Sequence, residues 1–547
     1  MKRLAALGVL LALPAAALDP RFSWETLVTP HFLIHYHQGM YRYAQRTARA
    51  AELSYQRLVP LLEHVPEDRT QVVVQDDTDF ANGNASPLLY NLIHAYAAPP
   101  DSRSTLGDFD DNVYELISHE YTHILHLDTV LGLPQAVNDI FGKLWITNGG
   151  QPLWFIEGIA TFAESEVSGS GRVRSSEEDM LVRAEVLAGV LPRIDTLSNV
   201  PLRWPRGFGQ YTVGSRFLDW VRDEYGLGAL RDLSHDYGAR FIPFALNISA
   251  ARVLGKTYLE LYDEFAAFEL NRAEQLRGQV RAAGETKLEP LTRLGEWVRT
   301  PRFSADGATL YYTNAGPDRR AEIRAISPGG DRHVATLYSD GAGDSGIAVA
   351  PDGRVVFARA EVYQEFEGLQ DLYSVDPVTG SERRITRGLR ARGPDVARDG
   401  AIAFVWRRPG GGTAIAELRP GEQTPRVLFE GPGGDPVDSP RWSPDGTRLA
   451  FLHHRQGAWD VRIVDRATLA VSDVTRDRAL DRDPAWTADG KWLLFSSDRT
   501  GIYDIYAWRP REEPGSPRRR AEAGGRSMGE EPGSPRRRAE AGGRSMG

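Results

Sequence analysis

The hydrophobic and polar positions divide the chain into two regions with different periodicities. In the first region, apolar residues recur at helical spacing, and short alternating or apolar runs lie between the helical segments. The pattern predicts helices over Tyr43–Leu58, Tyr114–Asp128, Trp154–Glu164 and Tyr258–Ala283, the first ending before Pro60. It predicts strands over Phe32–Tyr36, Gln71–Gln75 and Leu88–Tyr96, with a turn at Asn82–Ala85. This mixture predicts an α+β domain.

From Leu288 onward the pattern changes to short strands that repeat. Asp-Gly pairs recur with spacings of 46, 47, 46 and 44 residues, at Asp306, Asp352, Asp399, Asp445 and Asp489. Each pair is typical of a hairpin turn, and an alternating strand follows it. A period in the forties with several short strands per unit predicts a β-propeller of about five blades. The fifth blade lacks its last strand, so either Leu288–Arg293 supplies that strand or the chain is cut short.

The first region contains the pattern His-Glu-x-x-His at His119–His123. Residues four apart lie on one face of a helix, so His119 and His123 can reach one metal ion while Glu120 stays beside it. Hydrolytic zinc sites use three protein ligands and keep a fourth position for water, and Glu157 on the next helical run is the natural third ligand. Thr161, one turn after Glu157, is expected to hydrogen-bond a ligand. The alternative is a polar helix face with two ordinary histidines.

Composition narrows the chemistry. The chain of 547 residues has no cysteine, which excludes disulfides and thiolate zinc ligands. A zinc ion would therefore be held by histidines and carboxylates. The net charge of −9 gives no overall reason to expect nucleic acid as a partner. The length predicts more than one domain.

The two ends of the chain differ from the domains. Residues 1–17 combine two basic residues, an apolar stretch and a final Ala15-Ala16-Ala17, which predicts a signal peptide cleaved after Ala17, with an uncleaved anchor as the alternative. No later segment is apolar for long enough to span a bilayer. At the other end, residues 512–529 are repeated letter for letter by residues 530–547. We expect residues 510–547 to be disordered, and either a gene assembly error or a basic interaction tail explains the duplication.

Three motifs in this order resemble the gluzincin metallopeptidases of the peptidase MA clan: Asn82–Ala85, His119–His126 and Trp154–Ala160. The resemblance covers residues 25–270 and implies a thermolysin-like fold. It implies one Zn²⁺ ion held by His119, His123 and Glu157, with Glu120 as the general base. Tyr211, three residues before Gly214, matches a further family motif and would stabilise the oxyanion, although a packed core tyrosine is an equal alternative. Gluzincin aminopeptidases carry an acidic residue before the zinc helix that Asn82–Ala85 lacks, which favours an endopeptidase.

Ser443–Gly446 resembles the Ser-Pro-Asp-Gly signature of TolB-like propellers. We therefore predict a multidomain protein, with a gluzincin-like α+β domain at residues 18–284 and an all-β propeller at residues 285–509. Its expected function is that of a secreted zinc metallopeptidase that hydrolyses peptide bonds through a zinc-activated water, with a propeller that docks a substrate or an envelope protein partner. It would be exported to the periplasm or the extracellular space, where it could associate with the outer membrane. The alternative is a non-catalytic envelope binding protein in which the propeller carries the function.

Overall fold

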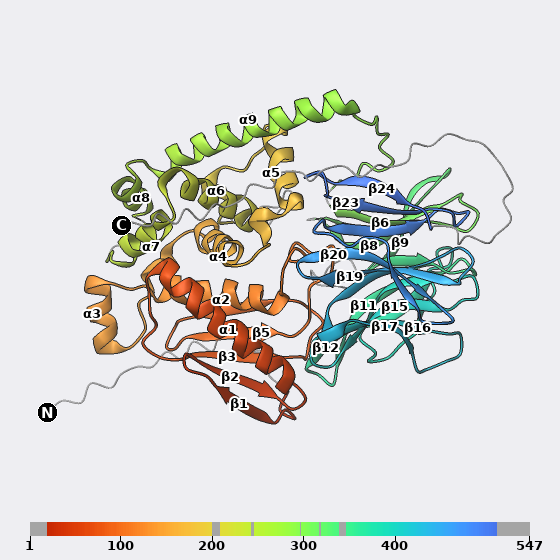
Figure 1. Cartoon of the computed structure of the whole chain (residues 1–547), viewed down its shortest axis with the longest axis horizontal. Helices are drawn as coiled ribbons and strands as arrows, with labels where there is room; N and C mark the ends of the chain where they lie inside the picture. The colour runs from red at the N-terminus through yellow and green to blue at the C-terminus, as the bar shows by residue number, and fades with distance from the viewer. Residues whose placement is uncertain are drawn as a thin grey trace, which may run out of the picture.

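The computed structural model of the chain describes residues 19–199, 208–241, 245–295, 297–316, 319–337 and 346–510. The predicted signal peptide and residues 511–547 of the predicted tail lie outside the described residues. Figure 1 shows a mixed helical and sheet domain beside a domain made only of sheets. Helix α9 ends at Gly284 and the first strand of the second domain begins at Trp297.

The first domain contains a sheet with strand order β1-β2-β3-β5-β4. Its strands are β1 Trp24–Val28, β2 Phe32–His37, β3 Thr70–Gln75, β4 Gly83–Ser86 and β5 Leu92–Tyr96. Strands β2, β3 and β5 are parallel, and β1 and β4 run antiparallel at the two edges. The predicted turn at Asn82–Ala85 is therefore wrong. Its residues enter β4, because pairing of Gly83–Ser86 with β5 satisfies their backbone groups on one side.

Helices cover this sheet and form the rest of the first domain. They are α1 Tyr41–Leu62, α2 Asn112–Asp128, α3 Gly132–Phe141, α4 Leu153–Val167, α5 Ser176–Ala188, α6 Gly209–Tyr225, α7 Gly228–Gly238, α8 Leu246–Leu254 and α9 Tyr258–Gly284, with short 3₁₀ turns at Thr147–Gly150, Arg172–Arg174 and Ile194–Thr196. Helix α1 continues through Pro60, contrary to the prediction. Pro60 cannot donate the hydrogen bond to the carbonyl of Gln56, but buried Leu58 and Leu62 hold this turn in the core.

Helix α2 is central to the first domain. Asp111 caps its N-terminus by accepting hydrogen bonds from the backbone N–H groups of Val113 and Tyr114. Almost every residue after the cap is buried, because α1 packs against one side of α2 and α4 against another. Figure 1 shows α2 enclosed in this way. A helix held on several sides gives its side chains fixed positions.

The second domain is built from five sheets within the described residues, each a meander of consecutive strands. The strands are β6 Trp297–Phe303, β7 Leu310–Gly316, β8 Arg319–Ser327 and β9 Gly330–Thr336; β10 Ile347–Val349, β11 Val355–Tyr363, β12 Glu367–Val375 and β13 Glu382–Arg384; β14 Ala391–Val396, β15 Ile402–Arg408, β16 Gly412–Leu418 and β17 Arg426–Glu430; β18 Val437–Trp442, β19 Arg448–Arg455, β20 Ala458–Asp465 and β21 Val471–Asp473; and β22 Asp481–Trp486, β23 Leu493–Ser497 and β24 Asp504–Trp508. A 3₁₀ turn spans Pro432–Gly434. The first strands of successive sheets pack side by side, as in a propeller.

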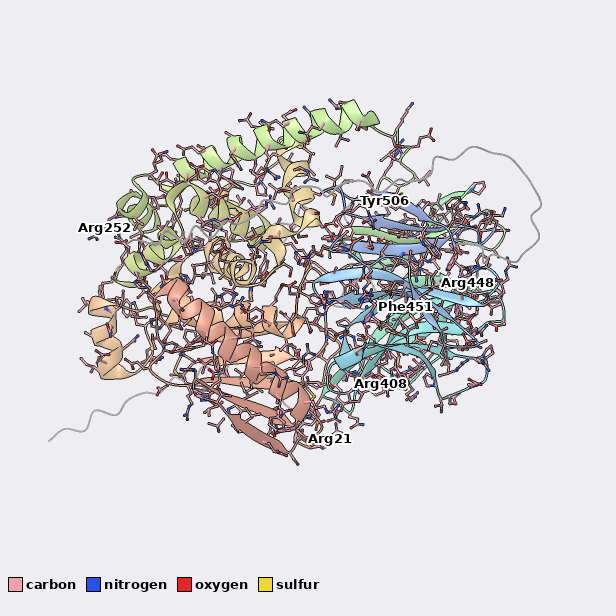
Figure 2. All side chains as sticks on the ribbon, viewed as in Figure 1. Arg21, Arg252, Arg408, Arg448, Phe451 and Tyr506 are labelled. Atoms are coloured by element: carbon pink, nitrogen blue, oxygen red, sulfur yellow. The ribbon has the colours of Figure 1, made fainter. Side chains whose placement is uncertain are left out.

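The propeller core lies between its sheets. Phe451, labelled in Figure 2, is fully buried against residues such as Leu449 and Val464. The last sheet has three strands, as the repeat pattern predicts. The suggestion that Leu288–Arg293 completes this sheet is wrong, because these residues form no strand and Leu288 and Leu291 are exposed.

Candidate metal centre

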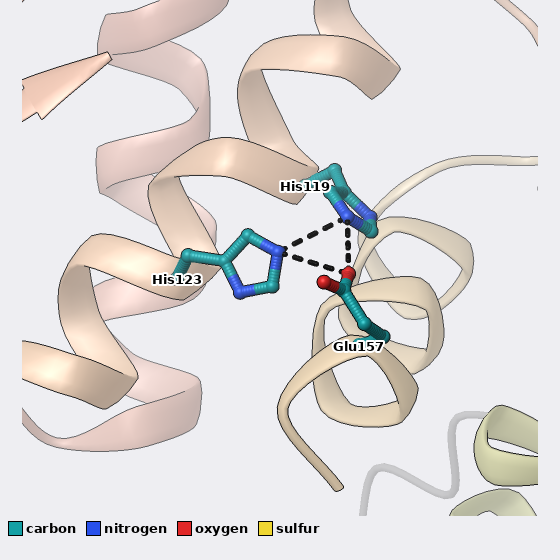
Figure 3. Close-up of side chains that lie close together, drawn as sticks. All are labelled: His119, His123 and Glu157. Atoms are coloured by element: carbon teal, nitrogen blue, oxygen red, sulfur yellow. Dashed lines mark hydrogen bonds and ion pairs between the residues drawn. The ribbon is translucent and has the colours of Figure 1, made fainter. Parts of the chain in front are cut away.

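Helices α2 and α4 bring the three predicted ligands together. Figure 3 shows the rings of His119 and His123 and the carboxylate of Glu157 converging on one point. His119 Nε2 lies 3.2 Å from His123 Nε2 and 3.5 Å from Glu157 Oε2. His123 Nε2 lies 3.3 Å from the same carboxylate oxygen. The three donor atoms therefore form a nearly regular triangle.

This triangle fits a tetrahedral zinc ion. Zinc binds nitrogen and oxygen ligands at about 2.0–2.2 Å, so two ligands of a tetrahedral site stand about 3.3–3.6 Å apart. The measured separations are 3.2, 3.3 and 3.5 Å. The donor set of two imidazoles and one carboxylate is also typical of hydrolytic zinc sites. His119, His123 and Glu157 can thus hold one zinc ion and leave its fourth position for water.

The back of the His119 ring is fixed by an ion pair that the sequence did not indicate. His119 Nδ1 lies 2.9 Å from Glu164 Oε2, and Arg172 donates to both oxygens of Glu164 at 2.8 and 2.9 Å. Arg172 Nη2 is also 3.0 Å from His119 Nδ1. When Nε2 binds a metal, the ring proton is on Nδ1, and Nδ1–H then donates to Glu164, because a carboxylate only accepts. The lone pair of Nε2 is then directed at the metal position.

The predicted hydrogen bond from Thr161 to a ligand is absent. Thr161 is fully buried and its hydroxyl has no hydrogen-bond partner in the described structure. Glu164 contacts His119 in its place, seven residues and two helical turns after Glu157. The same-face spacing of Glu157 and Glu164 could have revealed this role. Arg172 lies in a 3₁₀ turn after α4, and no local pattern marks it.

Charges at the site favour a cation. Burial opposes ionisation of Glu157, but its contacts with both histidines outweigh burial and hold its pKa well below the ordinary value. Burial would also lower the pKa of His119, yet Glu157 and Glu164 raise that pKa to about 9. The negative field that retains a proton on His119 would equally attract a metal ion, which competes for the same nitrogen.

Glu120 and Tyr211 lie beside the ligands without joining them. The Glu120 carboxylate faces strand β4, where a Cβ on Gly83 would stand 2.9 Å from Glu120 Oε1. Burial raises the pKa of Glu120. The Tyr211 ring centre is 6.3 Å from that of His119, and burial raises its pKa to about 12, so the phenol keeps its proton at neutral pH.

Two glycines explain how Tyr211 reaches this place. A Cβ on Gly158 of α4 would stand 2.8 Å from the backbone of Gly214, and a Cβ on Gly214 would stand 2.4 Å from the carbonyl oxygen of Trp154. Only glycine allows the helices to approach so closely. Since Tyr211 is one turn before Gly214, this contact sets it beside the metal ligands. His126, in contrast, is turned away, with Nδ1 2.8 Å from Ser234 Oγ.

The candidate metal centre opens into a cavity of about 1090 Å³ between the two domains. The first domain contributes the ligands, Glu120, Tyr211 and the edge strand β4. The propeller contributes side chains from its first three sheets, among them Trp297, Gln370 and Arg407. Within the described residues, no helix is long and apolar enough to cross a membrane.

Comparison with known proteins bears on the second domain. The family model of the TolB beta propeller domain matches residues 435–528. The Tol-Pal system protein TolB of Anaeromyxobacter dehalogenans is 27% identical over 194 residues, which cover 32% of this chain and 44% of that protein. The TolB protein of Bordetella pertussis is 34% identical over 151 residues, covering 19% of this chain and 34% of that protein. The chain thus spans less than half the length of these relatives.

The crystal structure of TolB from Acinetobacter baumannii matches with a TM-score of 0.34 and 20% identity, over 39% of this chain and 51% of that one. The residues matched by the family model lie after the domain that carries His119, His123 and Glu157. The chain is therefore a multidomain protein whose second domain is a TolB-like β-propeller.

Proposed function

We propose that this protein is a zinc-dependent peptidase whose first domain has a gluzincin-like fold. The observation that carries the proposal is the triangle of donor atoms from His119, His123 and Glu157, with edges of 3.2–3.5 Å. The carboxylate of Glu120 and the phenol of Tyr211 line the same cavity as that triangle.

Each residue has a chemical task in this proposal. Zinc, when bound, would lower the pKa of a water molecule from about 15.7 towards about 7 and would polarise the scissile carbonyl. Glu120 would accept a proton from the attacking water and pass it to the leaving amine, and burial makes its carboxylate a stronger base because it raises the pKa. Tyr211 donates its hydroxyl hydrogen to the oxygen on which negative charge develops. Glu164 and Arg172 hold the His119 ring in orientation.

Strand β4 offers a place for the substrate backbone. Among the strands that the structure describes it pairs with β5 alone and forms the sheet edge, and Gly83, Asn84 and Ala85 line the cavity. An extended peptide can add to such an edge as a further strand. Asn82–Ala85 supply no carboxylate for a free amino terminus, which supports internal cleavage over removal of N-terminal residues.

A second candidate is an envelope binding protein in which the propeller carries the function. The comparisons favour it over the peptidase, since the relatives from Anaeromyxobacter dehalogenans and Bordetella pertussis are Tol-Pal system proteins and the family match lies in the propeller. An envelope protein would then be its partner and the periplasm its location. In that case the three ligands would serve structure or be a remnant of an earlier activity.

Zinc content and peptide hydrolysis of the chain without residues 1–17, compared with those of Glu120→Gln, decide between the candidates. A pool of short internally quenched peptides serves as substrate. The peptidase proposal expects one zinc per chain in both proteins, and hydrolysis that falls about 10²–10⁴-fold in Glu120→Gln. Absence of zinc, or equal hydrolysis by both proteins, would favour the binding protein.

A further inference from the structure

The propeller forms one wall of the cavity that holds the candidate metal centre. The side chains of His119, His123 and Glu157 are only 9%, 9% and 17% exposed. Their cavity of about 1090 Å³ is close to the size of small-molecule sites, which reach roughly 1,000 Å³. A folded domain of 100 residues has a radius of gyration of about 13 Å and cannot enter such a space.

The propeller contacts the segment that precedes α2, the helix that carries His119 and His123. Phe109 is 2% exposed and packs with Trp459 and Val461 of the propeller. Trp459 Nε1 donates to the Gly107 carbonyl oxygen at 2.7 Å, and His454 Nε2 donates to that of Phe109 at 2.7 Å. Helix α2 begins three residues after Phe109. Phe109 therefore both anchors the propeller and lines the cavity.

The rest of the contact is mostly polar. Arg482 pairs with Asp108 at 2.5 Å, and Arg390 pairs with Asp76 at 2.7 Å and with Asp79 at 2.8 Å. Ser102 donates through its backbone N–H and its hydroxyl to Asp438, at 2.7 and 2.8 Å. Buried ion pairs add little net stability relative to their solvated state. Polar contacts of this kind are typical of domains that separate reversibly.

The covalent connection allows such a separation. Residues 285–295 join α9 to the propeller, contain no regular secondary structure and are largely exposed. Figure 1 places this connection at one end of the interface, at the end of α9, whereas β12 lies at the other end beside the first domain. At that far end Thr78 and Gly368 form an isolated β-bridge. Residues 285–295 can therefore act as a hinge, and the contact between Thr78 and Gly368 is the closing edge, where the two domains would separate first.

We propose that the propeller is a hinged lid on the catalytic cavity, and that the substrates are short extended peptides, which enter when the lid opens, rather than folded proteins. The substrate class rests on the peptidase function proposed above. The opening motion does not, so it can be tested without any activity.

Thiol labelling measures the opening directly, because the chain contains no cysteine. Ser102→Cys places a thiol at a fully buried position between the domains, and Ser54→Cys places one at an equally buried position between α1 and α2. A lid that opens predicts reaction of Ser102→Cys with a maleimide at least tenfold faster than that of Ser54→Cys. Equally slow labelling of both thiols would overturn the lid.

A reversible crosslink tests the effect on substrates. Thr78 Oγ1 lies 3.5 Å from the position of a Cβ on Gly368, so Thr78→Cys with Gly368→Cys can form a disulfide across the closing edge. We expect oxidation to reduce cleavage of short quenched peptides at least tenfold, reduction to restore it, and zinc content to stay constant. The two single variants are the controls.

The outcomes separate the two proposals. An oxidised crosslink that cleaves peptides as fast as its reduced form would overturn the lid and leave the peptidase function intact. Cleavage of a folded protein at the rate of its unfolded chain would overturn the substrate class. If the unsubstituted chain cleaves no peptide, the peptidase function fails, and the labelling rates still test whether the contact around Ser102 opens.

Discussion

The metal centre and the interdomain contact line the same cavity but are built differently. The metal centre takes its ligands from α2 and α4, which are packed into one apolar core with the sheet. The interdomain contact takes its residues from loops around β4 and β5 and from sheet ends across the propeller, and charged and hydroxyl groups dominate it. One wall of the cavity is thus rigid, and the other is held by exchangeable polar contacts.

Metal binding and domain opening therefore depend on different residues. A metal site needs donor atoms within a few tenths of an ångström of fixed positions, and buried helices provide that accuracy. A domain contact that opens needs many weak interactions and a small apolar anchor, here Phe109. Substitutions of the metal ligands on α2 and α4 should change metal binding without opening the cavity. Substitutions in the interdomain contact should open the cavity without changing metal binding.

Removal of a metal ligand should have the largest effect. His123→Ala leaves two ligands, and we expect zinc affinity to fall by more than the roughly 10–100-fold that changes behind a ligand produce. Zinc per chain after dialysis against a weak chelator measures the loss. His126→Gln is the matched control on the same helix, because His126 bonds Ser234 and points away from the site. Equal zinc in wild type and His123→Ala would remove the proposed site.

Removal of the apolar anchor should open the cavity. Truncation of a buried phenylalanine costs about 3–5 kcal/mol, so Phe109→Ala is expected to raise the labelling rate of Ser102→Cys by more than about a hundredfold. Phe268→Ala on α9, where the side chain is 47% exposed, should leave that rate unchanged. Zinc content should be the same in both variants. An unchanged labelling rate in Phe109→Ala would mean that the polar contacts alone hold the lid.

Sequence patterns predicted the features of the fold and of the site that depend on spacing within one element or repeat. The positions i and i+4 of His119 and His123, and the Asp-Gly repeat of the propeller, need no knowledge of the tertiary structure. The role of β4 was missed because Asn82-Gly83 has turn chemistry, which pairing with β5 overrides. Arg172 and the contacts of Phe109 were missed because their partners, Glu164 and Trp459, are set by packing between elements rather than by spacing within one.

The ion pair behind His119 should have a smaller effect than a ligand. Glu164→Gln removes the charge that fixes Nδ1–H, and we expect zinc affinity to fall about 10–100-fold. Thr161→Val is the control, because the Thr161 hydroxyl has no hydrogen-bond partner in the described structure, and its zinc affinity should match that of wild type. Competition with a chromophoric chelator measures both. Weakening in Thr161→Val but not in Glu164→Gln would restore the role that the sequence assigned to Thr161.

The smallest effect should come from pH, through His454 at the docked face of the propeller. Burial, only partly offset by the hydrogen bond to the Phe109 carbonyl, lowers the pKa of His454 from 6.5 to about 4. Between these values the open form binds a proton that the closed form does not, so closure weakens as pH falls through this window, by about 1.4 kcal/mol per unit.

From pH 6.5 to 5.5 the labelling rate of Ser102→Cys, divided by that of the denatured protein at each pH, should therefore rise by about fivefold, because the histidine of the open form is already half protonated at pH 6.5. His454→Gln keeps a donor for the Phe109 carbonyl and has no charge to gain, so its normalised rate should be flat over the same range. A flat profile in both proteins would show that His454 remains equally shielded when Ser102 becomes accessible. Opening would then be a local detachment of residues 101–106 rather than separation of the two domains.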